Sequence, residues 1–128
     1  MRRNKMDNYG AELILDLHDC DPRKFTRENI QNFFDTLCCR IKMEQCDLHW
    51  WDDLFTPESE KETDPKLVGT SAIQFIKTSN ITIHTLDIMK RVYLNIFSCK
   101  DFDRHVAEAT CHEYFDGTIM QSTLIRRY

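Results

Sequence analysis

Residues 67–97 read LVGTSAIQFIKTSNITIHTLDIMKRVYLNIF. This stretch contains three apolar runs in quick succession: Leu67–Ile76, Ile81–Leu86 and Val92–Phe97. Alternation with period two and many β-branched or aromatic residues are typical of strands. Short polar segments near Lys77–Asn80 and at Asp87–Lys90 separate the runs, as in hairpins. The stretch therefore predicts three neighbouring antiparallel strands.

The flanking sequence adds further elements. Glu12–His18 reads as a strand, and Asp19–Pro22 ends it with turn residues. Arg27–Ile41 has apolar residues at helical spacing and follows Thr26, a residue type that caps helices. The remaining predicted elements are a strand at Cys46–Trp51, a helix at about Phe102–Phe115 ended by Gly117, and a last strand at Thr118–Ile125. This order predicts an α+β two-layer sandwich, an antiparallel-rich sheet with two helices on one face.

Length and composition narrow the class of protein. The chain has 128 residues, 41% of them hydrophobic, which suits a single domain, residues 1–128, with one core. The polar, acidic segment 52–65 predicts a long surface loop. Three widely separated glycines exclude the dinucleotide fingerprint and the P-loop. A formal net charge of -4 gives no reason to expect nucleic acid as a partner.

No targeting or metal-binding pattern stands out. The start MRRNK is basic, but no apolar run follows it, and no stretch is long enough to span a membrane, so we expect a soluble, cytoplasmic protein. The six cysteines then read as free thiols. Cys46 with His49, and Cys99 with His105 and Cys111, lack the paired spacing of structural zinc sites, so we expect no metal.

Polar side chains gather at two places along the predicted hairpins. A turn near Lys77–Asn80 places Ser71 opposite Leu86 and diagonal to His84, on one face and about 7–8 Å apart. The next hairpin places Cys99 beside Ser79. At roughly 3.3 Å per residue the two clusters are too far apart to work together within one chain. A two-fold dimer could bring each cluster against the other cluster of its partner.

Four segments together resemble a known family: ELILDLHDCDP (12–22), GTSAI (69–73), KTSNITIHT (77–85) and LNIFSC (94–99). They are similar to the core of the small bacterial and archaeal S-adenosylmethionine decarboxylases, which are pyruvoyl-dependent. The resemblance implies that Ser79 becomes the pyruvoyl group after cleavage between Thr78 and Ser79, giving chains 1–78 and 79–128. It implies further that Ser71 and His84 assist the cleavage and that Cys99 is the catalytic proton donor.

The chemistry of these residue types agrees with those roles. Ser79 can attack the carbonyl of Thr78 to form an ester, with a hydroxyl such as Ser71 as stabilising donor. His84 can remove the α-proton of Ser79 so that elimination breaks the ester. The pyruvoyl ketone then forms a Schiff base with a substrate amine and accepts electrons as carbon dioxide leaves. A thiol such as Cys99 can return a proton to the substrate carbon.

Two positions depart from the family pattern. Thr78 stands where glutamate is usual before the cleaved serine, and Asn80 stands where histidine usually follows. Neither is required by the cleavage, but both flank the reactive group, so ornithine or arginine is an alternative amino-acid-type substrate to S-adenosylmethionine. A processing-dead homologue that binds a ligand or a partner subunit is a second alternative. Four aromatic residues could stack an adenine, although core packing is expected for most of them: Trp50, Trp51, Phe75 and Phe97.

Overall fold

The computed structural model describes residues 8–128, so the basic segment 1–5 lies outside the described residues. Six strands form one sheet in the order β2-β3-β4-β5-β1-β6, and every neighbouring pair is antiparallel. The strands are β1 (Gly10–Cys20), β2 (Gln45–Trp51), β3 (Gly69–Ile76), β4 (Ser79–Leu86), β5 (Arg91–Ser98) and β6 (Asp116–Arg127). The helices are α1 (Arg27–Arg40), α2 (Arg104–Phe115) and two short 3-10 turns, η2 (Pro22–Lys24) and η3 (Glu58–Glu60).

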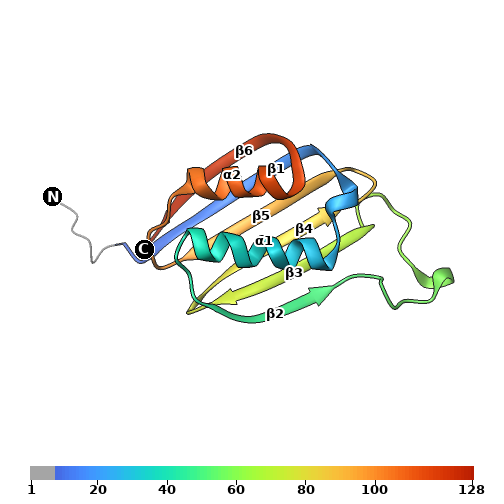
Figure 1. Cartoon of the computed structure of the whole chain (residues 1–128), viewed down its shortest axis with the longest axis horizontal. Helices are drawn as coiled ribbons and strands as arrows, with labels where there is room; N and C mark the ends of the chain where they lie inside the picture. Colours follow the sequence, from blue (N-terminus) through green and yellow to red (C-terminus); the bar gives the residue numbers. More distant parts are fainter. Residues whose placement is uncertain (1–7) are drawn as a thin grey trace.

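Both long helices pack on the same face of the sheet (Figure 1). Phe33 of α1 lies edge-on to Phe115 of α2, with ring centroids 4.9 Å apart, and both side chains are fully buried. Alternate residues of the central strands, such as Ile81 and Leu94, complete this core from the sheet side. The predicted α+β two-layer sandwich is therefore confirmed. No helix within residues 8–128 is long and apolar enough to cross a membrane.

The helices begin where capping residues stand. Thr26 caps α1, because its Oγ1 accepts a hydrogen bond from the backbone N–H of Asn29 at 3.1 Å. Asp103 caps α2 in the same way through the N–H of His105 at 2.8 Å. The second helix therefore starts two residues after the predicted Phe102. It ends at Phe115 as expected, and Asp116 and Gly117 both take positive φ angles before β6 begins.

The turn between β3 and β4 is shorter than the sequence suggested. It contains only Lys77 and Thr78, and Ile76 pairs with Ser79. Thr78 makes this tight turn possible by taking φ +57°, a left-handed conformation that usually needs glycine or asparagine. The predicted register, with Ser71 opposite Leu86, is therefore wrong by two residues.

The face of the sheet opposite the helices is open and partly apolar. Ile73 and Phe75 of β3 and Ile125 of β6 point to this face and are 38%, 42% and 44% exposed. Trp51 at the end of β2 is 54% exposed. Core packing, expected for most of the four aromatic residues, is wrong for Trp51, Phe75 and Phe97, since these side chains alternate away from the helices. Trp50 does pack against the core.

Candidate active site at the turn between β3 and β4

Ser79 and Cys99 meet at one end of the sheet, as predicted. Ser79 is the first residue of β4, and Cys99 follows the last residue of the neighbouring strand β5. The backbone N–H of Cys99 donates a hydrogen bond to Ser79 Oγ at 3.3 Å. Ser79 is 7% exposed, whereas the Cys99 side chain reaches the surface. The pairing of β4 with β5 therefore holds a serine hydroxyl against the main chain of an accessible thiol.

Thr78 joins this cluster from the turn. Its Oγ1 donates a hydrogen bond to the carbonyl of Lys77 at 2.7 Å and lies 3.6 Å from Cys99 Sγ. A β-branched residue at φ +57° is a steric outlier, because the Cβ substituents crowd the main chain there. Such conformations cost about 1–3 kcal/mol and concentrate at functional sites. A strained, β-branched residue therefore directly precedes Ser79.

The thiol of Cys99 is tuned by its neighbours. The hydrogen bond with Thr78 is the largest cause that lowers the pKa of Cys99 from its ordinary value, followed by smaller contributions from Ser79 and Tyr9, while partial burial opposes them. The buried cysteines behave in the opposite way, since burial raises the pKa of Cys38 to about 12 and that of Cys20 to about 11. Cys99 is thus placed for proton transfer and the buried thiols are not.

Cavities open on both sides of Cys99. One, of about 510 Å³, is lined by Thr78 and Cys99 and by residues that follow α1 and flank the turn: Lys42, Met43, Glu44, Ile76, Lys77, Ser98 and Lys100. Lys100 Nζ donates to the carbonyl of Lys42 at 2.7 Å, which ties the two walls together. A second cavity, of about 380 Å³, lies against Tyr9 and Cys99. A small molecule could therefore reach the thiol from either side.

Ser71 and His84 form the second predicted cluster at the other end of the hairpin. The two residues are directly opposite each other on β3 and β4, and Ser71 Oγ lies 2.7 Å from His84 Nδ1. Both side chains point to the open face, beside a cavity of about 280 Å³ that Trp51 also lines. The contact is closer than the diagonal pairing that the sequence suggested, because the shorter turn moves the register.

The two clusters do not meet within one chain. His84 lies five residues along β4 from Ser79, or roughly 16 Å at about 3.3 Å per residue. They also lie on opposite faces of the sheet, since Ser79 alternates with the buried residues Ile81 and Ile83, and His84 does not.

Within residues 8–128, no group of three or more His, Cys, Asp or Glu side chains could hold a metal ion.

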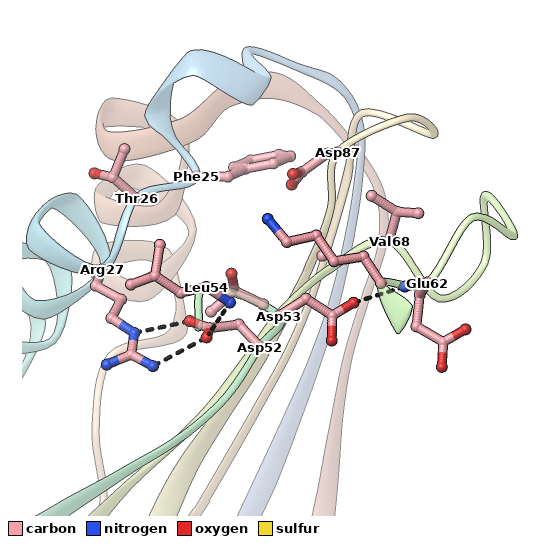
Figure 2. A pocket seen from close by; sticks show the side chains of 12 residues that line it. Phe25, Thr26, Arg27, Asp52, Asp53, Leu54, Glu62, Val68 and Asp87 are labelled. Carbon is pink, nitrogen blue, oxygen red and sulfur yellow. Dashed lines mark hydrogen bonds and ion pairs between the residues drawn. The ribbon is translucent and has the colours of Figure 1, made fainter. Parts of the chain in front are cut away.

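A further cavity, of about 500 Å³, lies between the start of α1 and the segment after β2 (Figure 2). Arg27 makes a bidentate ion pair with Asp52 there, at 2.8 and 3.0 Å, and its guanidinium lies 5.4 Å from the Trp50 ring centroid. Asp53 accepts a hydrogen bond from the N–H of Glu62 at 2.8 Å. The predicted surface loop 52–65 is therefore tied at its base and contains η3.

Sequence reasoning missed two contacts near Cys99. Tyr9, which precedes β1, stacks on Phe97 of β5 with ring centroids 6.0 Å apart and contributes to the lowered pKa of Cys99. Thr78 was predicted to precede the cleaved bond and to flank the reactive group, but its contact with Cys99 Sγ was not predicted. The sequence contained no signal for the second contact, because no glycine stands at Lys77–Asn80 to indicate a two-residue hairpin loop.

Similarity to known proteins extends over nearly the whole chain. Residues 11–128 match the protein family described as S-adenosylmethionine decarboxylase. The fold is similar to the crystal structure of the adenosylmethionine decarboxylase from Aquifex aeolicus VF5, with a TM-score of 0.73 and 17% identity over 94% of this chain and 91% of that chain. No curated protein sequence matches the chain. Because the family match covers nearly the whole chain, the protein belongs to the S-adenosylmethionine decarboxylase family.

Proposed function

We propose that this chain is a self-processing, pyruvoyl-dependent decarboxylase of S-adenosylmethionine that supplies spermidine biosynthesis. In the proposal it is cut between Thr78 and Ser79 into chains 1–78 and 79–128, and Ser79 becomes the pyruvoyl group. The observation that carries the proposal is the turn itself. A strained, β-branched Thr78 precedes a buried Ser79 whose hydroxyl is held against Cys99. Family membership implies a decarboxylase.

The first step is an acyl shift at the turn. Ser79 Oγ attacks the carbonyl carbon of Thr78, the hydroxyl proton passes to the Ser79 nitrogen, and the C–N bond breaks to leave an ester. An ester is less stable than an amide, so the step needs a compensating gain. Release of Thr78 from its left-handed conformation supports it, because about 1–3 kcal/mol of strain is removed when the main chain opens.

The second step is an elimination that requires a base. The base removes the α-proton of Ser79, the Cβ–Oγ bond breaks, and Thr78 leaves with a free carboxylate. Water then hydrolyses the dehydroalanine that remains, releasing ammonia and leaving a pyruvoyl group at position 79. His84 is the proposed base, and its short contact with Ser71 supports this role because the hydroxyl orients the ring.

His84 must come from a second copy of the chain. The residue lies about 16 Å along β4 from Ser79 in its own subunit, which excludes direct proton transfer there. The open face of the sheet carries His84 and Ser71 together with exposed Ile73 and Phe75. In the proposed dimer these faces pack together, with β4 against β4 in opposite directions, which buries the apolar residues. His84 of the partner subunit then comes to the turn and meets the main chain of Ser79, whose side chain faces the helices.

The residues around position 79 suit a pyruvoyl group. Ser79 begins β4 immediately beside Cys99, so a carbonyl there would lie next to an accessible thiol with a lowered pKa. When present, the group supplies an electrophilic carbonyl that withdraws electrons from the substrate as carbon dioxide leaves. Cys99 then donates the proton that replaces the lost carboxylate. A pKa closer to neutral lets the thiol give and regain this proton.

Carbon dioxide release from the purified, processed protein tests the substrate. We expect release from S-adenosylmethionine and little from ornithine or arginine at equal concentrations. The opposite ranking would assign the same machinery to another amino acid, in keeping with Thr78 and Asn80 at the two positions beside Ser79. A protein that is cut but releases carbon dioxide from none of the three would contradict the proposed activity.

A further inference from the structure

The side chain of Thr78 lies between two groups that compete for its single hydroxyl proton. Oγ1 donates to the carbonyl of Lys77 at 2.7 Å and lies 3.6 Å from Cys99 Sγ. A hydroxyl is both a donor and an acceptor. It can therefore accept a hydrogen bond from the Cys99 thiol while donating to Lys77, and can turn its proton toward sulfur when Cys99 is a thiolate.

The backbone fixes where this hydroxyl points. Thr78 has φ +57° in a two-residue turn whose neighbours, Ile76 and Ser79, are paired in the sheet. Cys99 is held from a second direction, because its N–H donates to Ser79 Oγ at 3.3 Å. The thiol is thus placed by two consecutive residues, with Ser79 of β4 acting on its main chain and Thr78 of the turn on its sulfur.

Charged groups line the cavities on both sides of Cys99, and its sulfur makes a hydrogen-bond contact of 3.6 Å with the Thr78 hydroxyl. The ionisable side chains that line the two adjoining cavities are Lys42, Glu44, Lys77 and Lys100 on one side and Tyr9, Asp101 and Arg126 on the other. Lys77 and Glu44 face each other at 3.8 Å, as do Arg126 and Asp101. The lowered pKa of Cys99 has the Thr78 hydrogen bond as its largest cause.

We infer that Thr78 is a positioning residue whose hydroxyl holds Cys99 Sγ beside Ser79 in the uncut chain, accepting from the thiol and donating to the thiolate. The inference rests on the proposed function, in which Cys99 is the proton donor of the processed enzyme. It means that the residue before the cut bond sets the place and the reactivity of this thiol until the main chain opens. It also predicts that serine can replace Thr78 in this task and that valine, which has the same shape without a hydroxyl, cannot.

The test measures thiol reactivity in a chain that cannot be cut. Thr78→Val and Thr78→Ser are each combined with Ser79→Ala, so that residue 78 stays attached in every protein. Iodoacetamide labelling of Cys99 is followed by peptide mass spectrometry from about pH 6 to pH 10, because the labelling rate reports the thiolate fraction. Cys39 and Cys46, which are exposed, serve as internal references. Circular dichroism checks folding, and Thr78→Ala replaces the valine variant should that variant not fold.

We expect Thr78→Val to slow labelling of Cys99 near pH 7 by about three- to tenfold and to move the midpoint of its pH profile upward. Thr78→Ser should reproduce the profile of the Ser79→Ala parent, and the reference cysteines should not change. A valine profile that coincides with the parent, or a serine profile that follows valine, would overturn the inference. Neither result depends on cleavage or on decarboxylation, so failure here is distinct from failure of the proposed function.

Discussion

The two ends of the β3–β4 hairpin differ in almost every physical respect. At the turn, Thr78 has a strained backbone and Ser79 is buried against the main chain of Cys99. At the other end, Ser71 and His84 sit opposite each other on regular strands and face open space. One end fixes in place the atoms that react in the proposed mechanism. The other end presents a hydroxyl and an imidazole to whatever approaches the open face.

This difference teaches that holding all four groups in one chain does not by itself make a complete site. The sheet that aligns Ser71 with His84 also separates them from Ser79, because strands are extended and stiff. In the proposed enzyme a second copy removes the separation.

Removing the nucleophile at the turn should have the largest effect. Ser79→Ala lacks the hydroxyl that forms the ester, so we expect no cleavage and no carbon dioxide release, as measured by denaturing gel and by release assay. Ser122→Ala, on β6 away from the hairpin, is the matched control and should be cut like the parent. Cleavage that survives in Ser79→Ala would place the cut at another residue.

Separating the two ends onto different chains tests the link between subunits. His84→Ala alone should remain uncut, as should Ser79→Ala alone. Co-expressed, they form mixed dimers in which the intact Ser79 of one chain meets the intact His84 of the other. We therefore expect cleavage of the His84→Ala chain only, detected by a tag of distinct mass. If co-expression leaves both chains whole, His84 does not act across the interface.

Relieving the strain at Thr78 should stabilise the uncut chain. In the Ser79→Ala background, Thr78→Gly fits φ +57° without a Cβ clash. We expect this substitution to raise the free energy of unfolding by about 1 kcal/mol, although glycine has greater freedom in the unfolded chain. Thr82→Gly, in the regular part of β4, should instead lower the free energy of unfolding by about 1 kcal/mol. Urea denaturation measures both. Equal losses at the two positions would show that Thr78 is unstrained.

Removing the ion pair between Arg27 and Asp52 should have the smallest effect on the protein. Asp52→Asn is expected to lower Tm by about 2 °C near neutral pH and to leave cleavage unchanged. The Arg27 hydrogen bond lowers the pKa of Asp52, so the stabilisation exists above the unfolded pKa of about 3.9 and disappears as pH falls through the lower folded pKa. Parent and variant Tm values should therefore converge in acid. A difference in Tm that persists at acid pH would show that Asp52 stabilises the fold through packing and not through its charge.

Much of the fold could be predicted because burial alternates regularly along the chain. The apolar periodicity of Ile81–Leu86 and of the first helix identifies the sheet, the helix and the face between them. The proximity of Ser79 to Cys99 also followed from pairing β4 with β5. These features depend on hydrophobic burial, which is visible in the order of residue types.

The register of the hairpin could not be predicted, since it depends on one backbone angle. The identity of residue 78 does not predict φ +57°, because threonine, like other β-branched residues, seldom adopts this conformation. The four-residue turn was therefore the better expectation, and it misplaced Ser71 relative to His84. The contact of Tyr9 with Phe97 and Cys99 was equally hidden, because it joins segments that are about 90 residues apart.

The mass of the purified, intact protein tests the central claim most directly. The account predicts two polypeptides, residues 1–78 and residues 79–128, with the second lighter by one molecule of ammonia than a fragment that begins with serine. That mass difference is specific to conversion of Ser79 into a pyruvoyl group. A single species of full length that does not change with time, or a second fragment with a free amino-terminal serine, would contradict it.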